Sequence, residues 1–267
     1  MILIKIGGGK NINWDAICED LASLVKNGEE VIVVHGSSAT RDEIAEKLGI
    51  PTKTITSPSG ITSVYTDKKA LEVLLMVYAG LINKQIVAKM QSYGINAVGL
   101  SGVDGRVWEA KRKDAVYSVE KGKTKLISDN LTGKVEKINT ELLNLLVKNK
   151  YIPVICPPAI SFNNEIVNTD NDMASAIMVG ALGIKQLIIL FEAPGMLRDI
   201  NDQKSLIKKI KKEELESYMK FAIGRMKKKL LGAQKALALG VKKICWGDGR
   251  VERPILNAMK GKGTVIE

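Results

Sequence analysis

The amino-acid sequence predicts an α/β protein, in the form of an open αβα sandwich with a mostly parallel central sheet. Short apolar segments of strand length alternate with longer segments of helical periodicity along the whole chain. No low-complexity linker and no internal repeat interrupts this alternation. Strands that are joined by helices usually form a parallel sheet with helices on both faces. Such a sheet binds its ligands at the carboxyl ends of its strands.

The first fifty residues predict two strand–helix units. The expected elements are a strand over 1–6, a helix over 14–26, a Val-rich strand over 30–35 and a helix over 38–48. Gly49 and Pro51 end the second helix, because glycine favours the C-terminal cap and proline cannot continue a helix.

The middle of the chain predicts one long helix and a surface excursion. A turn-rich segment around residues 57–60 precedes Asp67, whose carboxylate can cap a helix that runs towards Met90. Residues 96–100 form a buried strand, and residues 104–135, with glycines and alternating charge, indicate a β-hairpin at the surface.

The strand–helix alternation continues to the end of the chain. The expected helices are 139–149 and 172–182, and the expected strands are 151–156, 186–190, 242–246 and 263–266. Residues 204–239 are strongly basic and are expected to be helical.

The composition is that of a soluble protein. The chain has 267 residues, of which 45% are hydrophobic and 26% charged, enough for one large core or two lobes. Apolar runs of about five to eight residues predict no membrane-spanning helix. The N-terminus enters a strand directly, without the order of a signal peptide, so a cytoplasmic location is expected. Cys18, Cys156 and Cys245 are widely spaced and are expected to be small buried hydrophobic residues.

The charge balance indicates an acidic partner or ligand. Forty Lys and Arg against 29 Asp and Glu give a formal net charge of +11, which attracts anions at long range. Nucleic acid, an acidic protein and phosphate all fit, as does a solvated lysine-rich surface without a partner. Aromatic residues make up only 4% of the chain, so the stacking platforms of nucleic-acid binding are not evident, and we expect no nucleic-acid partner.

Two strand ends carry the small residues that an anion-binding loop needs. The first strand contains Lys5 and runs into Gly7, Gly8 and Gly9, and the second runs into His35, Gly36, Ser37 and Ser38 before a helix. Small residues let backbone N–H groups approach a phosphate, and a helix N-terminus adds its dipole. Each loop alone also fits a tight turn. Neither matches a Walker A or a GxGxxG motif.

Three charged residues suggest phosphoryl transfer. This reaction needs cations where negative charge spreads over the moving oxygens, and Lys5 and Lys229 can supply them. A carboxylate has to hold the two lysines in place, and Asp172 is the candidate. Asp172 also fits plain capping of a helix, and Lys229 fits one cation of a basic helix.

These segments resemble the amino acid kinase family, and within it the N-acetylglutamate kinase group. The resemblance covers essentially the whole chain and rests on Lys5 to Gly8, Val33 to Gly36, Ala79 to Lys84, Ala97 to Gly102, Val167 to Asp172 and Gly224 to Lys229. The chain is most similar to the branch that phosphorylates α-aminoadipate or glutamate on an amino-group carrier protein. The segments typical of that branch are Gly99 to Arg106, Thr132 to Glu136, Pro157 to Ser161, Gly224 to Lys229 and Gly247 to Glu252.

The resemblance implies a role for each matching residue. Lys5 and Lys229 would stabilise the transferring phosphoryl group, and Asp172 would organise the two lysines. The expected acceptor-site residues are Gly8, Gly36, Ser37, Ser38, Val64 and Asn168. The expected nucleotide-site residues are Gly7, Phe191, Glu192, Gly195 and Met226.

The resemblance also implies the organisation and the partners. Residues 1–171 would form the acceptor lobe and residues 172–267 the ATP-binding lobe, on one continuous sheet. ATP and Mg²⁺ would be required, and no protein cage for the metal is visible, which suits an ion held by phosphates and water. An acidic carrier protein would bring the acceptor, and basic residues 111–113, expected in the hairpin, would contact it. The protein would be a homodimer without membrane contact.

The chain departs from the family pattern at three places. Relatives commonly carry an arginine for the substrate carboxylate where this chain has Val64, so Lys68, Lys53 or Arg41 would have to replace it. Relatives have a small hydroxyl residue followed by Asp or Asn where this chain has Phe191 and Glu192. Ser37 and Ser38 replace glycines, and their backbone donors survive if no positive φ is needed.

The resulting hypothesis is an ATP-dependent carboxylate kinase that forms an acyl phosphate on carrier-linked α-aminoadipate or glutamate, in lysine or arginine biosynthesis. Two alternatives stay open. The first is a kinase for free N-acetylglutamate. The second is a non-catalytic module that binds an amino acid or a nucleotide.

Overall fold

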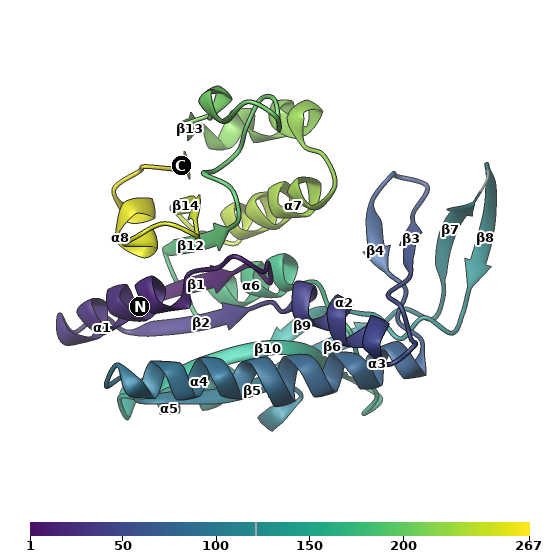
Figure 1. Ribbon diagram of the computed structural model, residues 1–267, viewed down its shortest axis with the longest axis horizontal. Helices are drawn as coiled ribbons and strands as arrows, with labels where there is room; N and C mark the ends of the chain where they lie inside the picture. The colour runs from purple at the N-terminus through teal and green to yellow at the C-terminus, as the bar shows by residue number, and fades with distance from the viewer. Residues whose placement is uncertain (121) are drawn as a thin grey trace.

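The computed structural model describes residues 1–120 and 122–267. Its strands are β1 (Ile2–Ile6), β2 (Val31–His35), β3 (Thr54–Thr56), β4 (Thr62–Val64), β5 (Ala97–Gly102), β6 (Trp108–Arg112), β7 (Val116–Glu120), β8 (Lys123–Ile127), β9 (Gly133–Ile138), β10 (Ile152–Ser161), β11 (Ile166–Val167), β12 (Gln186–Phe191), β13 (Lys209–Ile210), β14 (Lys243–Asp248) and β15 (Thr264–Ile266). Figure 1 shows how they are arranged.

The α-helices are α1 (Trp14–Lys26), α2 (Ser38–Lys47), α3 (Lys68–Leu74), α4 (Asn83–Ser92), α5 (Thr140–Lys148), α6 (Asn171–Ala181), α7 (Arg225–Ala238) and α8 (Pro254–Met259). A π-helical segment, Leu75–Ile82, joins α3 to α4 into one continuous helix. Short 3-10 helices lie at Asp104–Arg106, Gln203–Ser205 and Lys212–Phe221. Asp67 caps α3 by accepting a hydrogen bond from the Ala70 N–H, which confirms the expected start of the long helix.

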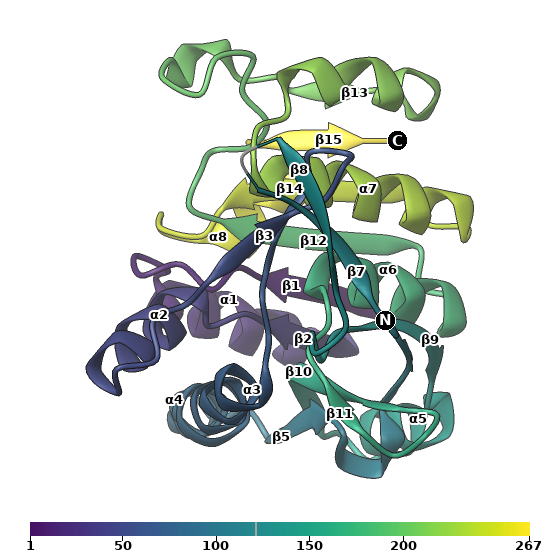
Figure 2. The ribbon, with the colours of Figure 1, turned by 90° about the vertical axis from the view of Figure 1, so that its right-hand side faces the viewer.

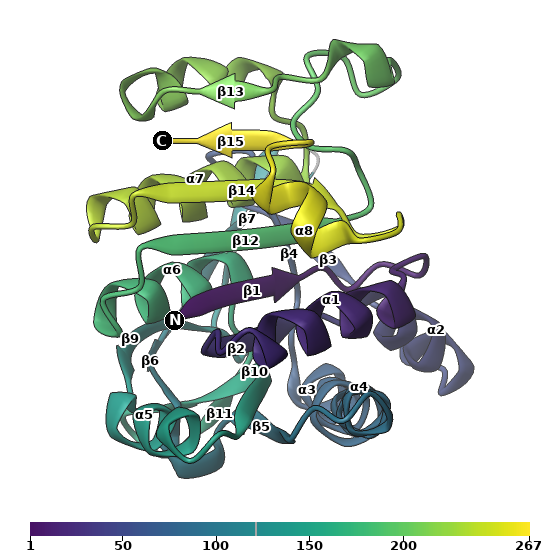
Figure 3. The same ribbon diagram turned by 90° about the vertical axis from the view of Figure 1, so that its left-hand side faces the viewer.

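One continuous sheet of eleven strands runs through the molecule. Its order is β13-β15-β14-β12-β1-β2-β10-β6-β9, and β5 and β11 pair with β10. Figure 3 shows this order from β13 at the top down to β1. All pairs among β14, β12, β1, β2, β10, β5 and β6 are parallel. The mostly parallel sheet expected from the sequence is therefore confirmed.

The alternation of β1 explains how the two faces of the sheet are covered. Ile2, Ile4 and Ile6 pack with residues of α1, α4 and α8 in one buried apolar cluster. Leu3 points to the other face and packs in a second cluster with residues of α5, α6 and α7. Lys5 lies on the same face as Leu3, so its side chain points towards α6 and α7.

Residues 104–135 form less of a hairpin than the sequence indicates. Strands β6 and β9 join the edge of the main sheet as an antiparallel pair, and only β7 and β8 form a separate hairpin. Lys111 and Arg112 lie on β6, so the expectation that they belong to the hairpin is wrong. A second hairpin, β3–β4, surrounds the turn-rich segment and packs beside β7. Figures 1 and 2 show the two hairpins side by side.

The prediction of one helical segment over 204–239 is wrong. This part contains a 3-10 turn, the short strand β13, the 3-10 helix Lys212–Phe221 and only then α7. Gly224, with a φ of +54°, separates the last two, because this backbone conformation breaks helical continuity and suits glycine. The sequence also gave no indication of α8.

The sequence predicts no helix that could span a membrane, and the continuous helix Lys68–Ser92 corrects this prediction. Among the described residues, this is the one helix whose length and composition would allow it to cross a membrane. Core helices of soluble proteins meet the same criterion, and Val73, Val77 and Met90 of this helix are buried in the protein core. The three cysteines are buried, as expected.

Candidate active site

A cleft of about 680 Å³ opens where β1, β2 and β12 end. This is the carboxyl edge of the parallel strands, where the fold class places a ligand. Of the fourteen residues singled out in the sequence, Ser37 alone does not line the cleft. The other thirteen do: Lys5, Gly7, Gly8, Gly36, Ser38, Val64, Asn168, Asp172, Phe191, Glu192, Gly195, Met226 and Lys229.

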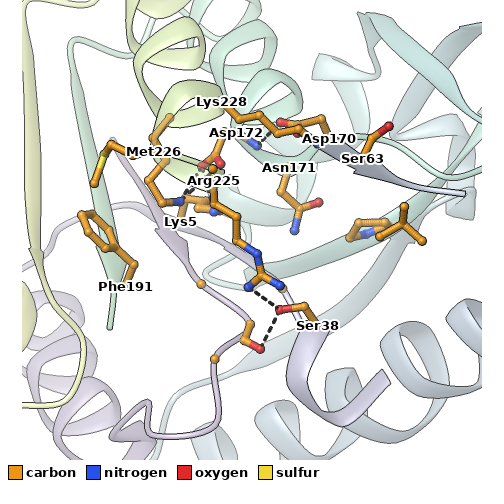
Figure 4. A pocket seen from close by; sticks show the side chains of 18 of the residues that line it. Lys5, Ser38, Ser63, Asp170, Asn171, Asp172, Phe191, Arg225, Met226 and Lys228 are labelled. Carbon is orange, nitrogen blue, oxygen red and sulfur yellow. Dashed lines mark hydrogen bonds and ion pairs between the residues drawn. The ribbon is translucent and has the colours of Figure 1, made fainter. Parts of the chain in front are cut away.

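Lys5, Asp172 and Lys229 meet in the cleft. The Lys5 Nζ lies 2.8 Å from Asp172 Oδ1, and the Lys229 Nζ lies 3.3 Å from both carboxylate oxygens. Lys5 comes from β1, Asp172 from the first turn of α6 and Lys229 from α7, and all three are nearly buried. Figure 4 shows Lys5 and Asp172 side by side. Asp170, and not Asp172, caps α6, because its carboxylate accepts from the Asp172 and Met173 N–H groups. The interpretation of Asp172 as a plain helix cap is therefore wrong.

The electrostatics of this group is that of two cations sharing one anion. Burial alone would raise the pKa of Asp172, but the two lysines hold that pKa far below its usual range. Burial lowers the pKa of Lys229 to about 8, the charge of Lys5 adds to this, and Asp172 opposes it. The pKa of Lys5 is raised, because the Asp172 charge and hydrogen bond together outweigh its burial. The group carries a net positive charge at neutral pH and can attract an anion.

The two glycine-containing loops are in direct contact. A Cβ atom on Gly8 would come within 2.3 Å of the Ser37 nitrogen, so only glycine fits there. The Ser38 hydroxyl donates to the Gly8 carbonyl at 3.0 Å and accepts from Arg225 at 3.2 Å, which ties both loops to α7. Ser37 has a φ of −151°, so serine at this position needs no left-handed backbone.

Buried polar side chains hold the second loop in place. Asn171 donates to the His35 carbonyl at 3.0 Å, so the loop is joined to the start of α6. His35 is completely buried, and burial lowers its pKa to about 4, which keeps the ring neutral at pH 7. The neutral ring donates from Nδ1 to the Gly36 carbonyl and accepts at Nε2 from Asn83. Asn83 also donates to Val154 of β10.

One wall of the cleft gathers the residues expected at the acceptor. The Asn168 amide donates to the Thr66 hydroxyl at 3.0 Å, which places β11 beside the segment after β4. Val64 lines this wall, and so does Arg41. Lys53 and Lys68, the other two cations considered as replacements, are exposed and are not among the lining residues.

An apolar wall of the cleft comes from the C-terminal part of the chain. Its exposed apolar side chains are Ile200 and Ile223, with Leu197 and Phe221 beside them. Phe191 is buried at the base, where its ring lies 5.1 Å from the Lys229 Nζ. The Glu192 carboxylate accepts a 2.6 Å hydrogen bond from the Asn11 N–H and so closes the first loop.

Sequence reasoning missed several polar residues that line the cleft, among them Tyr78, Asn130 and Arg225. Arg225 lies within the Gly224 to Lys229 segment, which gave a signal, although Arg225 itself was not assigned to the site. Tyr78 gave no signal in the sequence, because it lies among the apolar residues of Leu75–Ile82 and resembles an ordinary core residue there. Among the described residues, no group of three or more His, Cys, Asp or Glu side chains lies close enough to hold a metal ion.

A family model and several full-length relatives match this chain. The family model "Amino acid kinase family" matches residues 1–245. A LysW-aminoadipate kinase from Deinococcus radiodurans is 48% identical, over all of this chain and 91% of that protein. One from Thermus thermophilus is 45% identical over the full length of both. A LysW-aminoadipate/LysW-glutamate kinase from Sulfolobus acidocaldarius is 36% identical, also over the full length of both.

Solved structures share the fold at lower identity. N-acetylglutamate synthase from Neisseria gonorrhoeae matches with a TM-score of 0.80 at 20% identity, over 99% of this chain and 58% of that one. Carbamate kinase from Giardia lamblia matches with a TM-score of 0.67 at 15% identity, over 99% and 97%. The family match and the full-length relatives confirm the resemblance seen in the sequence: the chain belongs to the amino acid kinase family.

Proposed function

We propose that this enzyme phosphorylates the side-chain carboxylate of α-aminoadipate, or of glutamate, that is attached through its amino group to a carrier protein. As a member of the amino acid kinase family, it is an ATP-dependent phosphotransferase. The convergence of Lys5 and Lys229 on Asp172 at the base of the cleft carries the proposal. The names of the full-length relatives supply the acceptor.

The chemistry follows from the charges. A carboxylate oxygen of the acceptor attacks the γ-phosphorus of ATP, the bond to the β–γ bridging oxygen breaks, and an acyl phosphate and ADP result. Negative charge grows on the bridging oxygen and is spread over the transferring group. Lys5 and Lys229 stabilise this charge, and Asp172 holds both ammonium groups at fixed positions, so little reorganisation is needed during the reaction. The backbone N–H group of Gly8 binds the phosphoryl oxygens, whereas the Gly36 N–H already donates to the Ile6 carbonyl at 2.9 Å.

Magnesium accompanies the nucleotide in this proposal. The ion would neutralise phosphate charge when bound, and phosphates and water would supply its ligands, since the described residues offer no carboxylate cage. The acceptor occupies the lobe of residues 1–171, which contains Val64 and Asn168. ATP occupies the lobe of residues 172–267, where the apolar wall of Ile200 and Ile223 suits the base.

The partner is an acidic carrier protein, which a chain of net charge +11 attracts. Lys113 is the basic residue of the 111–113 segment that lines the cleft, whereas Arg112 is paired with Glu165.

We place the enzyme in the cytoplasm as a homodimer. Met76 and Leu81 on the long helix are exposed apolar side chains that a second copy can cover, and light scattering tests this.

The test is a comparison of acceptors. Purified enzyme is incubated with Mg-ATP and carrier-linked aminoadipate, carrier-linked glutamate or free N-acetylglutamate, and hydroxylamine traps the acyl phosphate. Hydroxamate should form with a carrier-linked acid and should disappear in Lys229→Ala. Hydroxamate from N-acetylglutamate alone would identify the other kinase activity, and none with any acceptor would leave a binding module.

A further inference from the structure

The acceptor wall, which is the part of the cleft that contains Val64 and Asn168, has no cation at position 64, where the family resemblance implies one. Val64 stands where the family resemblance implies an arginine for a substrate carboxylate. Aminoadipate or glutamate that is attached through its amino group has two carboxylates, of which the side-chain one is phosphorylated. The other, the α-carboxylate, enters the cleft as a charge that is costly to bury without a partner.

Arg41 lies next to this position. Arg41 and Val64 both line the large cleft, and both also line a small adjoining cavity, so the two side chains share one wall. Helix α2 follows directly on the Ser37 loop and carries Arg41 in its first turn. Burial raises the pKa of Tyr78, another lining residue, and the nearby charge of Arg41 opposes this shift.

The hydrogen bonds of Arg41 leave one edge of its guanidinium group available. Nε and Nη2 donate to Asp42 Oδ1 at 3.0 and 2.6 Å. Among the described residues, Nη1 has no hydrogen-bond partner. Asp42 thus holds one edge of the planar group. The edge formed by Nη1 and Nη2 can donate two parallel hydrogen bonds to a carboxylate.

The other cations near the cleft are less suitable. Lys53 and Lys68 are exposed and do not line it. Arg225 donates to Ser38, so it lies at the glycine loops and not at the acceptor wall. Lys113 lines the cleft but is exposed, and a solvated ammonium group contributes less to binding than a buried guanidinium.

We propose that Arg41 replaces the missing arginine and binds the α-carboxylate of the acceptor amino acid. The charge has moved from β4 to α2, while the carboxylate keeps a bidentate partner. This inference rests on the proposed function, because it assumes an acceptor with two carboxylates.

Kinetics of Arg41→Met and Arg41→Lys test the proposal. Removal of the bidentate pair should raise the KM for the carrier-linked acceptor about 10- to 100-fold and leave the KM for ATP unchanged. Arg41→Lys should lie between wild type and Arg41→Met, because it keeps the charge and loses the fork. Lys53→Met is the matched control, since it removes one nearby charge outside the cleft and should change neither constant.

A second variant, which moves the arginine from position 41 to position 64, separates the loss of the charge from a loss of folding. Val64→Arg in the Arg41→Met background should recover most of the acceptor affinity, measured both as KM and by calorimetric titration with the carrier-linked acid in the absence of ATP. An acceptor KM for folded Arg41→Met within twofold of wild type overturns the inference. No turnover of any carrier-linked acid by the wild-type enzyme would instead overturn the proposed function.

Discussion

The ammonium nitrogen of Lys229 lies 5.1 Å from the centroid of the Phe191 ring. This is the distance of a favourable cation–π contact, which stabilises the charged form of the lysine. Trp246 packs edge-on against the ring and holds its orientation, with the ring centroids 6.2 Å apart. Phe191, at a position where the resemblance implies a small hydroxyl residue, therefore supports one of the two lysines of the proposed phosphate site.

The first prediction concerns the alkaline limit of activity. Burial lowers the pKa of Lys229 to about 8, so the free enzyme loses this charge as the pH rises through 8 and kcat/KM should fall there. Phe191→Leu removes the ring, which should shift this limb to lower pH by about half a unit or more. Phe191→Tyr keeps an aromatic face and should keep the wild-type profile. Identical profiles for Leu and wild type would exclude the contact as a support of the charge.

The second prediction separates transition-state stabilisation from substrate binding. Lys5→Ala or Lys229→Ala should lower kcat by about 100-fold or more, with a much smaller rise in the KM of the acceptor, because the contacts strengthen as charge develops on the moving oxygens. Steady-state kinetics with saturating Mg-ATP measure this. A Lys229→Ala enzyme with near-normal turnover would remove Lys229 from the proposed mechanism.

The third prediction concerns stability. The buried carboxylate of Asp20 accepts hydrogen bonds from the Ile255 and Leu256 N–H groups at 2.9 and 3.1 Å, at the start of α8. Asp20→Ala should lower the free energy of unfolding by about 2 kcal/mol, because two buried donors lose a charged partner. Urea denaturation measures the change. Asp15→Ala is the matched control, because Asp15 is an exposed carboxylate on α1, the helix that also carries Asp20. It should lower the free energy of unfolding much less.

Asp20 also shows where sequence reasoning ends. The strand–helix alternation and the glycine loops predicted the sheet, because their signals lie within a few neighbouring positions. The three residues named for the lysine–aspartate cluster do meet in the fold, and their roles stay a prediction. Helix α8 escaped prediction because its N-terminal donors are bound by a residue that precedes them by 235 and 236 positions. Arg41 could be named as one of three replacements for the missing arginine, but only the folded chain places it beside Val64.

The fourth prediction concerns acid stability. His35, the sole histidine of the chain, is held neutral by burial, which lowers its pKa to about 4. The unfolded chain takes up this proton below about pH 6.5, so the stabilising contribution is complete above that pH and is lost as the pH falls towards 4. Urea midpoints between pH 7 and 5 should fall, and should fall less in His35→Gln. An equal decline in both proteins would assign the effect to carboxylates alone.

The last prediction concerns the carrier. A free amino acid derivative needs only a local cationic pocket, whereas a folded acidic carrier responds to charges around the cleft. Lys113 is exposed and lines the cleft, so Lys113→Gln should lower kcat/KM for the carrier-linked acid several-fold at low salt through a slower association rate. The difference should vanish as added salt screens the charges, since the Debye length falls from about 30 Å at 0.01 M to about 3 Å at 1 M. Lys26→Gln removes an exposed lysine that does not line the cleft and serves as the matched control. A loss that persists at high salt would show that Lys113 contacts the reacting acid itself, and equal behaviour of the two variants would place the carrier on another face of the enzyme.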